Sequence, residues 1–206
     1  VAEAPAATTI TGHEWLKHRG SVGRPLFGEV KVVDRAGRAV EPDNVGEVYL
    51  RPGAGIRNEH RPIGFEHDRR LPDGWQSFGD LGWLDDEGYL YLCDRLTDVI
   101  QAENTAIYPH TVEAPILEHP QVLSCAVVGL PGKRGERVHA VVQSRGPLTD
   151  DDLRAYLTPR MAPGTVPATF RFVDTPLRDA CDKVDRLALR EQEIQLMSPS
   201  RGNRCQ

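Results

Sequence analysis

The sequence predicts an α+β fold in two parts, a β-rich part that ends near Arg95 and a small α+β domain after it. Two observations lead to this prediction. Up to Arg95, apolar residues alternate in short segments separated by glycine turns, as in antiparallel strands. Beyond Arg95 the order becomes helix, strand, strand, helix, strand, helix. We therefore expect one unit over residues 1–95, a second over 96–197, and a disordered tail over 198–206.

The β-rich part is predicted from its valines and turns. The first dozen residues are small and polar, which is typical of a frayed terminus. The segments "EVKVVD" (29–34) and "GEVYLR" (46–51) predict two strands, separated by the turn "RAGR" and the loop "EPDN". Residues 28–51 should therefore be antiparallel β structure. The polar segment 52–74, with its prolines and glycines, favours a surface loop.

A β-hairpin is predicted over "WLDDEGYLYLC" (83–93). Two apolar strands flank "DDEG", where Gly88 can take a positive φ. Asp80 and Arg95 flank this hairpin, one on each side. The hairpin pattern alone does not say whether they have a function.

The second part is predicted element by element. "YPHTVEAPILEHP" (108–120) favours a helix with Pro109 at its first position, and Pro115 should kink or split it. "VLSCAVVGLP" (122–131) and "ERVHAVVQSR" (136–145) predict strands. "LTDDDLRAYLTPRM" (148–161) predicts a helix with Thr149 as N-cap and acidic residues in its first turn. "ATFRFVD" (168–174) predicts a strand and "KVDRLALREQEIQLM" (183–197) a last helix.

Composition narrows the classes of function. The chain has 206 residues, 39% of them hydrophobic, and a net charge of -5, so it has no basic excess for binding nucleic acid or an anionic membrane. Its four cysteines contain no CxxC pair, which favours free thiols in a reducing compartment. No apolar run reaches membrane-spanning length, and the first residues lack the pattern of a signal peptide. We expect a cytoplasmic protein.

Several motifs of self-contained active sites are absent. In "HEWLKH", His13 and His18 are five residues apart and miss the spacing that lets HExxH ligate zinc, so we expect no metal there. The chain has neither the GxxxxGK[ST] phosphate loop nor a GxSxG nucleophile elbow. His110, His119 and His139 fall on predicted helix or strand surfaces and are interpreted as satisfied or solvated. Spacing alone indicates no catalytic constellation.

Five segments in order resemble the adenylate-forming acyl-CoA synthetases, the family of fatty-acid, aryl and bile-acid CoA ligases, luciferases and peptide-synthetase adenylation domains. They are "GSVGRP", "GEVYLR", "GWQSFGDLGWLDDEGYLYLCDRLTDVI", "YPHTVEAPILEHPQVLSCAVVGLP" and "GERVHAVV". The resemblance covers about residues 20–190. It implies that residues 1–95 end a large AMP-binding domain and that residues 96–197 are a small mobile C-terminal domain.

The resemblance implies a two-step reaction. A carboxylate, here a fatty or other hydrophobic acid, attacks the α-phosphate of Mg²⁺-bound ATP to give an acyl-adenylate. Coenzyme A then displaces AMP. Asp80 in "SFGDLG" matches the aspartate that binds the ribose hydroxyls. Arg95 matches the arginine before the hinge, which contacts the ribose or phosphates. Lys183 in "CDKVDR" matches the mobile catalytic lysine that bridges carboxylate and phosphate oxygens. Without the resemblance, Lys183 would be interpreted as a surface lysine.

The chain departs from the family pattern at positions that the family uses for nucleotide binding, for the hinge and for coenzyme A. Phe78 replaces a threonine beside the nucleotide, and the hinge position is Thr97 in place of Asp or Lys. Glu103 and Asn104 replace the glycine pair that lets pantetheine pass, and "PLRDACDK" replaces the expected Pro-Arg and Gly-Lys. Asp182, next to Lys183, would compete for its charge.

Two interpretations therefore stay open. The chain is the C-terminal portion of an active ligase whose phosphate loop and acyl pocket lie outside it. Alternatively, it is a truncated, inactive remnant or a non-catalytic interaction module on the same scaffold. The retained core strands fit both interpretations, and the altered site positions favour the second.

Overall fold

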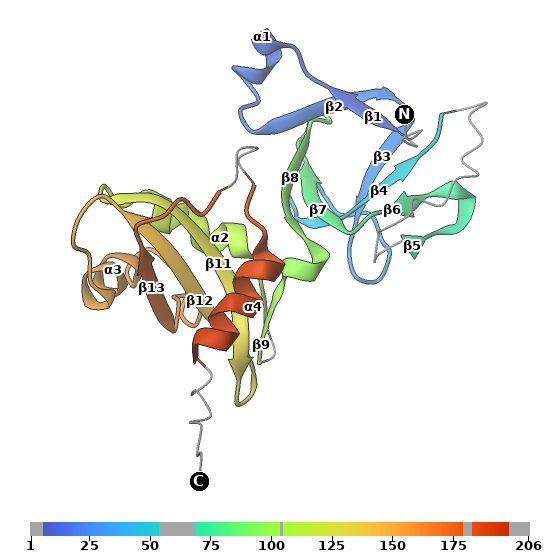
Figure 1. The fold of residues 1–206 in the computed structure, drawn as a ribbon. Helices are drawn as coiled ribbons and strands as arrows, with labels where there is room; N and C mark the ends of the chain where they lie inside the picture. The colour runs from blue at the N-terminus through green and yellow to red at the C-terminus, as the bar shows by residue number, and fades with distance from the viewer. Residues whose placement is uncertain (1–5, 54–68, 104, 179–182, 198–206) are drawn as a thin grey trace. The chain divides into compact units, whose positions relative to one another are not determined.

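The computed structural model describes residues 6–53, 69–103, 105–178 and 183–197 (Figure 1). The chain divides into two compact units, Val1–Thr97 and Asp98–Gln206. Strands dominate the first unit, whereas the described part of the second combines a sheet with three helices, so the expected α+β class is confirmed. Asn104 and the expected disordered tail lie outside the described residues. Within the described residues, no helix is both long and apolar enough to cross a membrane.

The first unit is built on a sheet of eight strands, counted over the described residues, in the order β1-β2-β8-β7-β4-β6-β5 with β3 also pairing with β4. All of its strand pairs are antiparallel. A small cluster of buried valine and leucine side chains, centred on Val32, Val48 and Leu90, forms its core. The elements are β1 (Ala7–Thr9), α1 (Gly12–Trp15), β2 (Ser21–Phe27), β3 (Glu29–Val33), β4 (Gly46–Arg51), β5 (Arg69–Arg70), the 3-10 turn η1 (Pro72–Gly74), β6 (Gln76–Ser77), β7 (Asp80–Leu84), β8 (Leu90–Arg95) and η2 (Leu96–Asp98).

The predicted antiparallel pair over residues 28–51 is confirmed. β3 and β4 pair from Glu29 opposite Arg51 to Val33 opposite Glu47. Because side chains alternate between the faces of a strand, this register buries Val32 and Val48 together. Of the predicted loop 52–74, the described part contains the short strand β5 and the turn η1.

The predicted hairpin over residues 83–93 is also confirmed. β7 and β8 pair antiparallel, and Gly88 has a φ of +81°. The Asp85 carboxylate accepts hydrogen bonds from the N–H groups of Glu87 (3.0 Å) and Tyr89 (2.9 Å). These bonds hold the chain reversal in place.

The prediction of a frayed N-terminus is wrong from Ala7 onward. β1 pairs with β2, which supplies backbone partners that a local pattern cannot indicate. Thr11 and Glu14 then form a capping box around the one-turn helix α1. His18 lies outside this helix, with its ring stacked on Tyr89 at 3.7 Å and Nδ1 3.1 Å from Asp85. The "HEWLKH" histidines therefore share no helix face.

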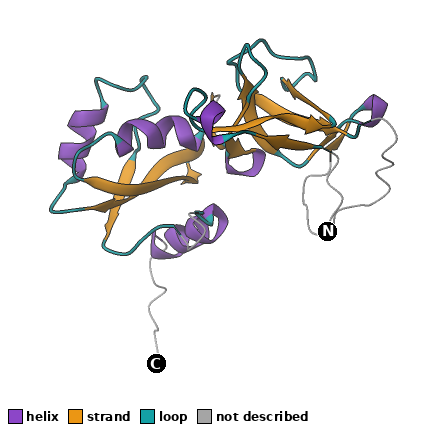
Figure 2. Ribbon diagram, turned by 90° about the horizontal axis from the view of Figure 1, so that it is seen from above, coloured by secondary structure: helices purple, strands orange, loops and turns teal. Residues whose placement is uncertain are grey.

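The second unit has three layers, with a sheet between helices on its two faces (Figure 2). Over the described residues the sheet has five strands in the order β10-β9-β12-β11, and β13 pairs parallel to β12. Two helices, α2 and α3, cover one face, and α4 covers the other. The elements are β9 (Ile100–Ala102), β10 (Thr105–Ile107), α2 (Pro109–Leu117), β11 (Val122–Gly132), β12 (Gly135–Ser144), α3 (Asp150–Leu157), β13 (Thr169–Val173) and α4 (Arg186–Met197).

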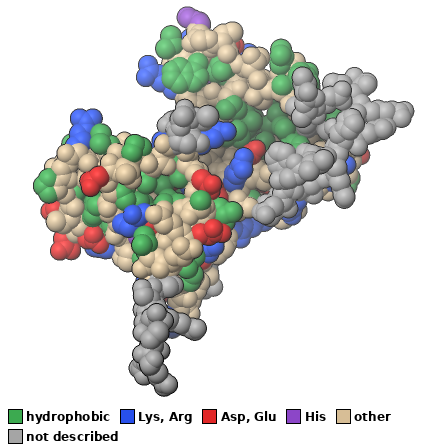
Figure 3. Space-filling view, in the orientation of Figure 1, with side chains coloured by type: hydrophobic (Ala, Val, Ile, Leu, Met, Phe, Trp, Pro, Cys, Tyr) green, Lys and Arg blue, Asp and Glu red, His purple; other side chains and the backbone are tan. Residues whose placement is uncertain are grey.

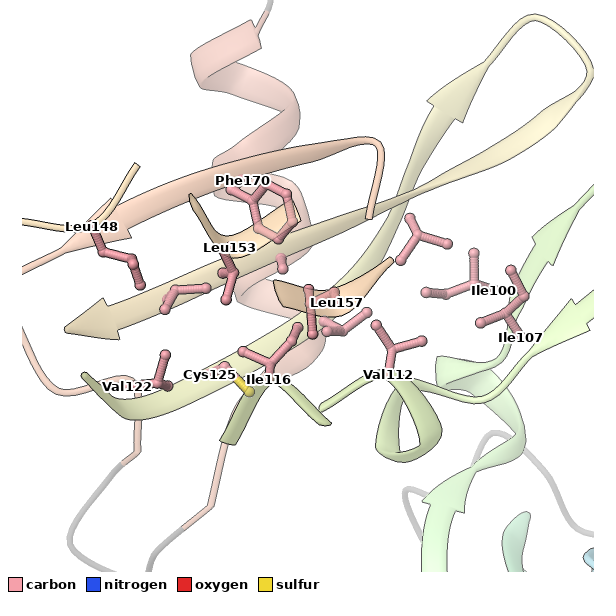
Figure 4. Close-up of a cluster of buried hydrophobic side chains, with 14 residues drawn as sticks. Ile100, Ile107, Val112, Ile116, Val122, Cys125, Leu148, Leu153, Leu157 and Phe170 are labelled. Carbon is pink, nitrogen blue, oxygen red and sulfur yellow. The ribbon is translucent and has the colours of Figure 1, made fainter. Parts of the chain in front are cut away.

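The core of the second unit lies between the sheet and helices α2 and α3 (Figure 4). Val112 and Ile116 of α2 and Leu153 of α3 are fully buried there against alternate residues of the strands. Burying such a side chain contributes about 1.5–3 kcal/mol each. Strand alternation turns the residues between them, such as His139, toward α4. This packing explains why β11 and β12 read as nearly continuous apolar runs.

Most predicted elements of the second unit are confirmed, with three differences. α2 begins with Pro109 and continues past Pro115 as one helix, so it is not split. The hairpin of β9 and β10 was not predicted, since three-residue strands carry too little pattern. His139, expected on a surface, is 1% exposed because α4 covers it. Thr149 caps α3 as predicted, in a capping box with Asp152.

Candidate functional site

The first group of candidate residues lies at the open ends of β7 and β8. Asp80 is the first residue of β7, Arg95 the last of β8, and the two face each other in the strand register. Arg95 Nε lies 3.6 Å from Asp80 Oδ1, which is close enough for an ion pair and too long for a hydrogen bond. The side chains are 68% and 41% exposed. Both therefore keep polar atoms that a ligand can reach.

The backbone around Asp80 is held by a tight turn. Gly79 has a φ of +83°, its N–H donates to the buried Ser77 hydroxyl (3.1 Å), and its carbonyl accepts from the Leu96 N–H (2.7 Å). Partial burial raises the pKa of Asp80, and the positive charge of Arg95 opposes that rise. The turn thus fixes a partly desolvated carboxylate beside an arginine.

The predicted hinge residue Thr97 lies on the 3-10 turn η2 that follows β8. It is exposed, and the boundary between the two compact units falls directly after it. Its neighbour Asp98 belongs to the second unit. This turn is the place in the chain where one unit ends and the other begins.

Glu103 lies in the loop between β9 and β10 with a φ of +47°, in the left-handed region that favours glycine. Glu103 stands where the family pattern has a glycine, and its backbone keeps a conformation that glycine favours. Gly135 packs directly against this loop. A Cβ on Gly135 would lie 2.7 Å from the Gln101 carbonyl oxygen and 2.8 Å from the Glu103 nitrogen, so only glycine fits there. Asn104 lies outside the described residues.

An open groove of about 790 Å³ lies beside Glu103 in the second unit. Its walls come from the β9–β10 loop, the β11–β12 turn and the segment before β13. Its cations are Lys133 and Arg134 of the turn and Arg137 of β12. Of the two acids that line it, Glu136 is paired with Arg190 at 2.7 Å, and Glu103 lies 4.0 Å from Arg134. The groove therefore offers positive charge on a backbone-rich surface, which suits a phosphate-bearing ligand.

Lys183 lies at the entrance to α4. It is exposed, and Asp185 two residues later caps the helix by accepting from the Ala188 N–H at 3.0 Å. Residues 179–182, including Asp182, lie outside the described part of the chain. The exposed position agrees with either interpretation of Lys183, as a catalytic or as a surface lysine.

Charged side chains also hold α4 on the sheet, and sequence reasoning did not identify them. On the α4 side of the second unit, acidic and basic side chains lie among apolar ones (Figure 3). Arg186 pairs with Glu113 of α2. Arg171 Nε donates to Glu193 Oε2 at 2.9 Å, and the same oxygen lies 3.3 Å from His139 Nε2. Burial lowers the pKa of His139, against the opposing effect of Glu193. The one available signal was an acid, Glu113, on the apolar face of a predicted helix.

Comparison with known proteins gives concordant results. The family model described as AMP-binding enzyme C-terminal domain matches residues 111–179. The chain is 33% identical over 179 residues to the 2-succinylbenzoate–CoA ligase of Bacillus licheniformis, covering 86% of this chain and 37% of the relative. It is 34% identical over 192 residues to the fatty acid–[acyl-carrier-protein] ligase ScoC of Streptomyces coeruleorubidus, covering 91% of this chain and 36% of that protein.

A solved structure agrees in fold. O-succinylbenzoate coenzyme A synthetase from Bacillus subtilis, in complex with ATP and magnesium ion, superposes with a TM-score of 0.69 at 33% identity. The match covers 88% of this chain and 38% of that one. The chain thus spans less than two fifths of the length of each of these three proteins.

Proposed function

The chain belongs to the adenylate-forming acyl-CoA ligases as a C-terminal portion, and on this premise we propose that it takes part in an ATP-dependent, AMP-forming ligation of a carboxylic acid to coenzyme A. The observation that supports the proposal most is the pairing of Asp80 with Arg95. They lie opposite each other at 3.6 Å, with both side chains accessible.

The proposed reaction has two steps. In the first, a carboxylate oxygen of the acid attacks the α-phosphorus of ATP, and the bond to the pyrophosphate oxygen breaks. Mg²⁺ enters with ATP as the counter-ion of its phosphates. In the second, the thiolate of coenzyme A attacks the acyl carbonyl carbon, and AMP leaves with the electron pair of the broken bond.

Asp80 and Arg95 are proposed to bind the nucleotide. An ionised Asp80 carboxylate can accept hydrogen bonds from both ribose hydroxyls of ATP, and such charge-assisted bonds are about twice as strong as neutral ones. Arg95 can donate to ribose or phosphate oxygens from the neighbouring strand. Because the protein places no hydrogen bond between the two side chains, ligand binding need not break one.

Lys183 is proposed as the catalytic group of the first step. Its ammonium can donate to the oxygens of the attacking carboxylate and of the α-phosphate, where negative charge builds up in the transition state. Lys183 is exposed at the entrance to α4, so its ammonium lies where solvent and a substrate can reach it.

The groove beside Glu103 is proposed to accept coenzyme A. Lys133, Arg134 and Arg137 carry the positive charge that the phosphates of this thiol require. The backbone of Glu103 is in the left-handed conformation that glycine favours, although the Glu103 side chain adds bulk to the loop. The acid is proposed to be a fatty or other hydrophobic acid, supported by the fatty-acid ligase among the relatives.

A second candidate function is a non-catalytic module on the same scaffold. The residues that favour it are Phe78, Thr97 and Glu103, which replace family residues at the nucleotide, the hinge and the pantetheine path. In this case the core would be retained while ATP and coenzyme A no longer bind.

The test uses a hybrid protein in which residues 20–197 replace the matching part of the Bacillus subtilis synthetase. AMP release is measured with ATP, coenzyme A and a panel of acids. The hybrid should form AMP, and Lys183→Ala should slow adenylation on the order of 100-fold, in line with the loss of one transition-state contact. Lys31→Ala, a lysine over the Trp75 ring, is the matched control and should leave the rate unchanged.

Two results would contradict the ligase proposal. One is an active hybrid in which Lys183→Ala changes nothing. The other is a folded hybrid that forms no AMP and shows no ATP binding by calorimetry, which would favour the non-catalytic module.

A further inference from the structure

The entrance to α4 is tied to a buried carboxylate on another helix, and we infer that Glu113 is a positioning residue for Lys183. Through Arg186, Glu113 holds the first turn of α4, and with it the segment that carries Lys183. The functional half of this inference rests on the proposed function, because Lys183 needs a fixed position only if it acts on a substrate. The structural half concerns the chain alone.

Glu113 is buried, with 8% of its side chain exposed, and its carboxylate has several donors. The Nη2 of Arg186 donates to Oε1 (2.8 Å) and to Oε2 (2.9 Å). The Val127 N–H of β11 donates to Oε1 at 2.9 Å. A carboxylate that binds an arginine and a strand backbone together has one orientation only, so it is a rigid anchor.

Arg186 is close to Lys183 in the chain, so fixing Arg186 also limits where Lys183 can lie. It is the first residue of α4, directly after the cap Asp185, and three residues after Lys183. Its Nη1 also lies 3.8 Å from Oδ2 of Asp98, on the turn η2. The guanidinium therefore joins α2, Asp98 and the entrance to α4, all of which belong to the second unit.

The buried Cys125 thiol lies close to Glu113, since it donates to the Glu113 backbone carbonyl at 3.7 Å. Burial and the Glu113 carboxylate raise the pKa of the Cys125 thiol, while the positive charges of Arg178 and Arg186 lower it. Arg178 is the last described residue before Lys183, and Arg186 is the first residue of α4.

The effect of Glu113 should be local because α4 has two further anchors. Arg190 donates to the Gly129 carbonyl at 2.7 Å and pairs with Glu136 at 2.7 Å. Glu193 pairs with Arg171 near the end of the helix. Loss of the first anchor should loosen the entrance to α4 while the remaining turns stay on the sheet.

The structural test is amide hydrogen exchange on the 206-residue chain, with Arg186→Met compared to Arg190→Met. Both variants replace an arginine by methionine on the same helix, one turn apart. Arg186→Met should speed exchange over residues 183–188 at least tenfold. Arg190→Met should leave those amides within about twofold of the parent chain.

A double variant separates positioning from stability. Glu113→Gln keeps the size of the side chain and an oxygen for the Val127 N–H, yet removes the negative charge that pairs with Arg186 Nη2. Glu113→Gln combined with Arg186→Met removes both charges, which should restore the melting temperature lost in either single variant. Exchange at residues 183–188 should remain fast in the double variant, because the anchor is still absent.

The activity test uses the hybrid protein and measures the two half-reactions separately. In the double variant, adenylation should fall on the order of 10-fold to 100-fold in kcat, as expected for a misplaced catalytic group. The KM for ATP should stay within about twofold. Transfer of the acyl group to coenzyme A from a supplied acyl-adenylate should also be unchanged, since Lys183 is proposed to act in the first step.

The outcomes are distinguishable. Unchanged exchange at residues 183–188 in Arg186→Met would overturn the inference, whatever the activity. Faster exchange with normal adenylation, in a hybrid that needs Lys183, would overturn the functional half. If Lys183→Ala itself has no effect, the proposed function fails, and the exchange experiment alone decides whether Glu113 fixes this segment.

Discussion

Two sets of charged side chains, one in each unit, are used in opposite ways. In the first unit, Asp80 and Arg95 stand 3.6 Å apart at the ends of two strands, with 41% and 68% of their side chains exposed. In the second unit, the carboxylates of Glu113 and Glu193 are 8% and 2% exposed and bind arginines through two contacts each. One pair is open to a ligand, whereas the others are occupied by the protein.

The difference shows how to distinguish a binding charge from a structural one. A buried carboxylate must find its partners inside the protein, because desolvation without them costs several kcal/mol. An accessible carboxylate can exchange water for a ligand at little cost. Ion pairs that look alike in sequence, Asp with Arg or Glu with Arg, therefore differ in role according to their burial.

The largest effect is expected for the buried network of the second unit. Glu193→Gln should lower the free energy of unfolding of this unit by about 3 kcal/mol, since it leaves Arg171 without its charged partner. Glu191→Gln, at an exposed position of the same helix, should change it by less than about 0.5 kcal/mol.

The two units can be followed separately in this experiment. All three tryptophans, Trp15, Trp75 and Trp83, are in the first unit, so their fluorescence reports its unfolding in urea. Far-UV circular dichroism follows the helices of the second unit. A parallel loss of both signals at lower urea would contradict a role of Glu193 confined to its own unit.

A smaller effect, on binding, is expected at the open pair. Asp80→Ala in the hybrid protein should weaken ATP binding by about tenfold to a hundredfold, because a charge-assisted hydrogen bond contributes about 1.5–3 kcal/mol. Calorimetry measures the affinity. Asp86→Ala, at the exposed tip of the hairpin, is the matched control.

Asp85 is a poor control for Asp80 although it is the nearer acid of the turn. It accepts hydrogen bonds from the Glu87 and Tyr89 N–H groups and from the Tyr91 hydroxyl. Asp85→Ala should therefore lower stability. Equal, small changes in ATP affinity for Asp80→Ala and Asp86→Ala would rule out the ribose role.

The next effect concerns strain at the groove. Glu103→Gly should raise the free energy of unfolding of the second unit by about 0.5–1 kcal/mol. The variant removes the strain of a non-glycine residue in the left-handed region. Part of this gain is lost because glycine has more conformational entropy in the unfolded chain. Glu103→Ala keeps the Cβ and should give no such gain. A stabilisation of equal size in both variants, measured by urea unfolding, would assign the effect to the side chain and not to the backbone.

The smallest effect is a titration in the first unit. Hydrogen bonds from the Thr11 side chain and N–H, and from the Tyr89 hydroxyl, lower the pKa of Glu14 from 4.5 to about 2. A lowered pKa means that the stabilisation is complete above pH 4.5 and is lost as the pH falls toward 2. NMR titration of the carboxyl should show this midpoint, and Thr11→Ala should move it toward 4.5. A midpoint already near 4.5 in the parent chain would mean that the capping box does not form in solution.

Local patterns in the sequence were sufficient for the longer elements. The β3–β4 pair, the hairpin around Gly88, the Thr149 cap and the six elements from Pro109 onward follow from alternation, turn residues and capping chemistry, which act within a few residues. The resemblance in the ordered segments proposed Asp80, Arg95 and Lys183 as site residues, and the strand register places Asp80 opposite Arg95.

Only the tertiary structure decided the rest, because long-range contacts leave little local trace. The strand at Ala7 depends on β2 for its hydrogen bonds, and the burial of His139 depends on α4, more than 40 residues later in the chain. The pairing of Glu113 with Arg186 joins residues 73 apart. The sequence determined which side chains could carry charge. Burial in the folded chain decided which of these charges are paired inside the protein and which remain accessible to a ligand.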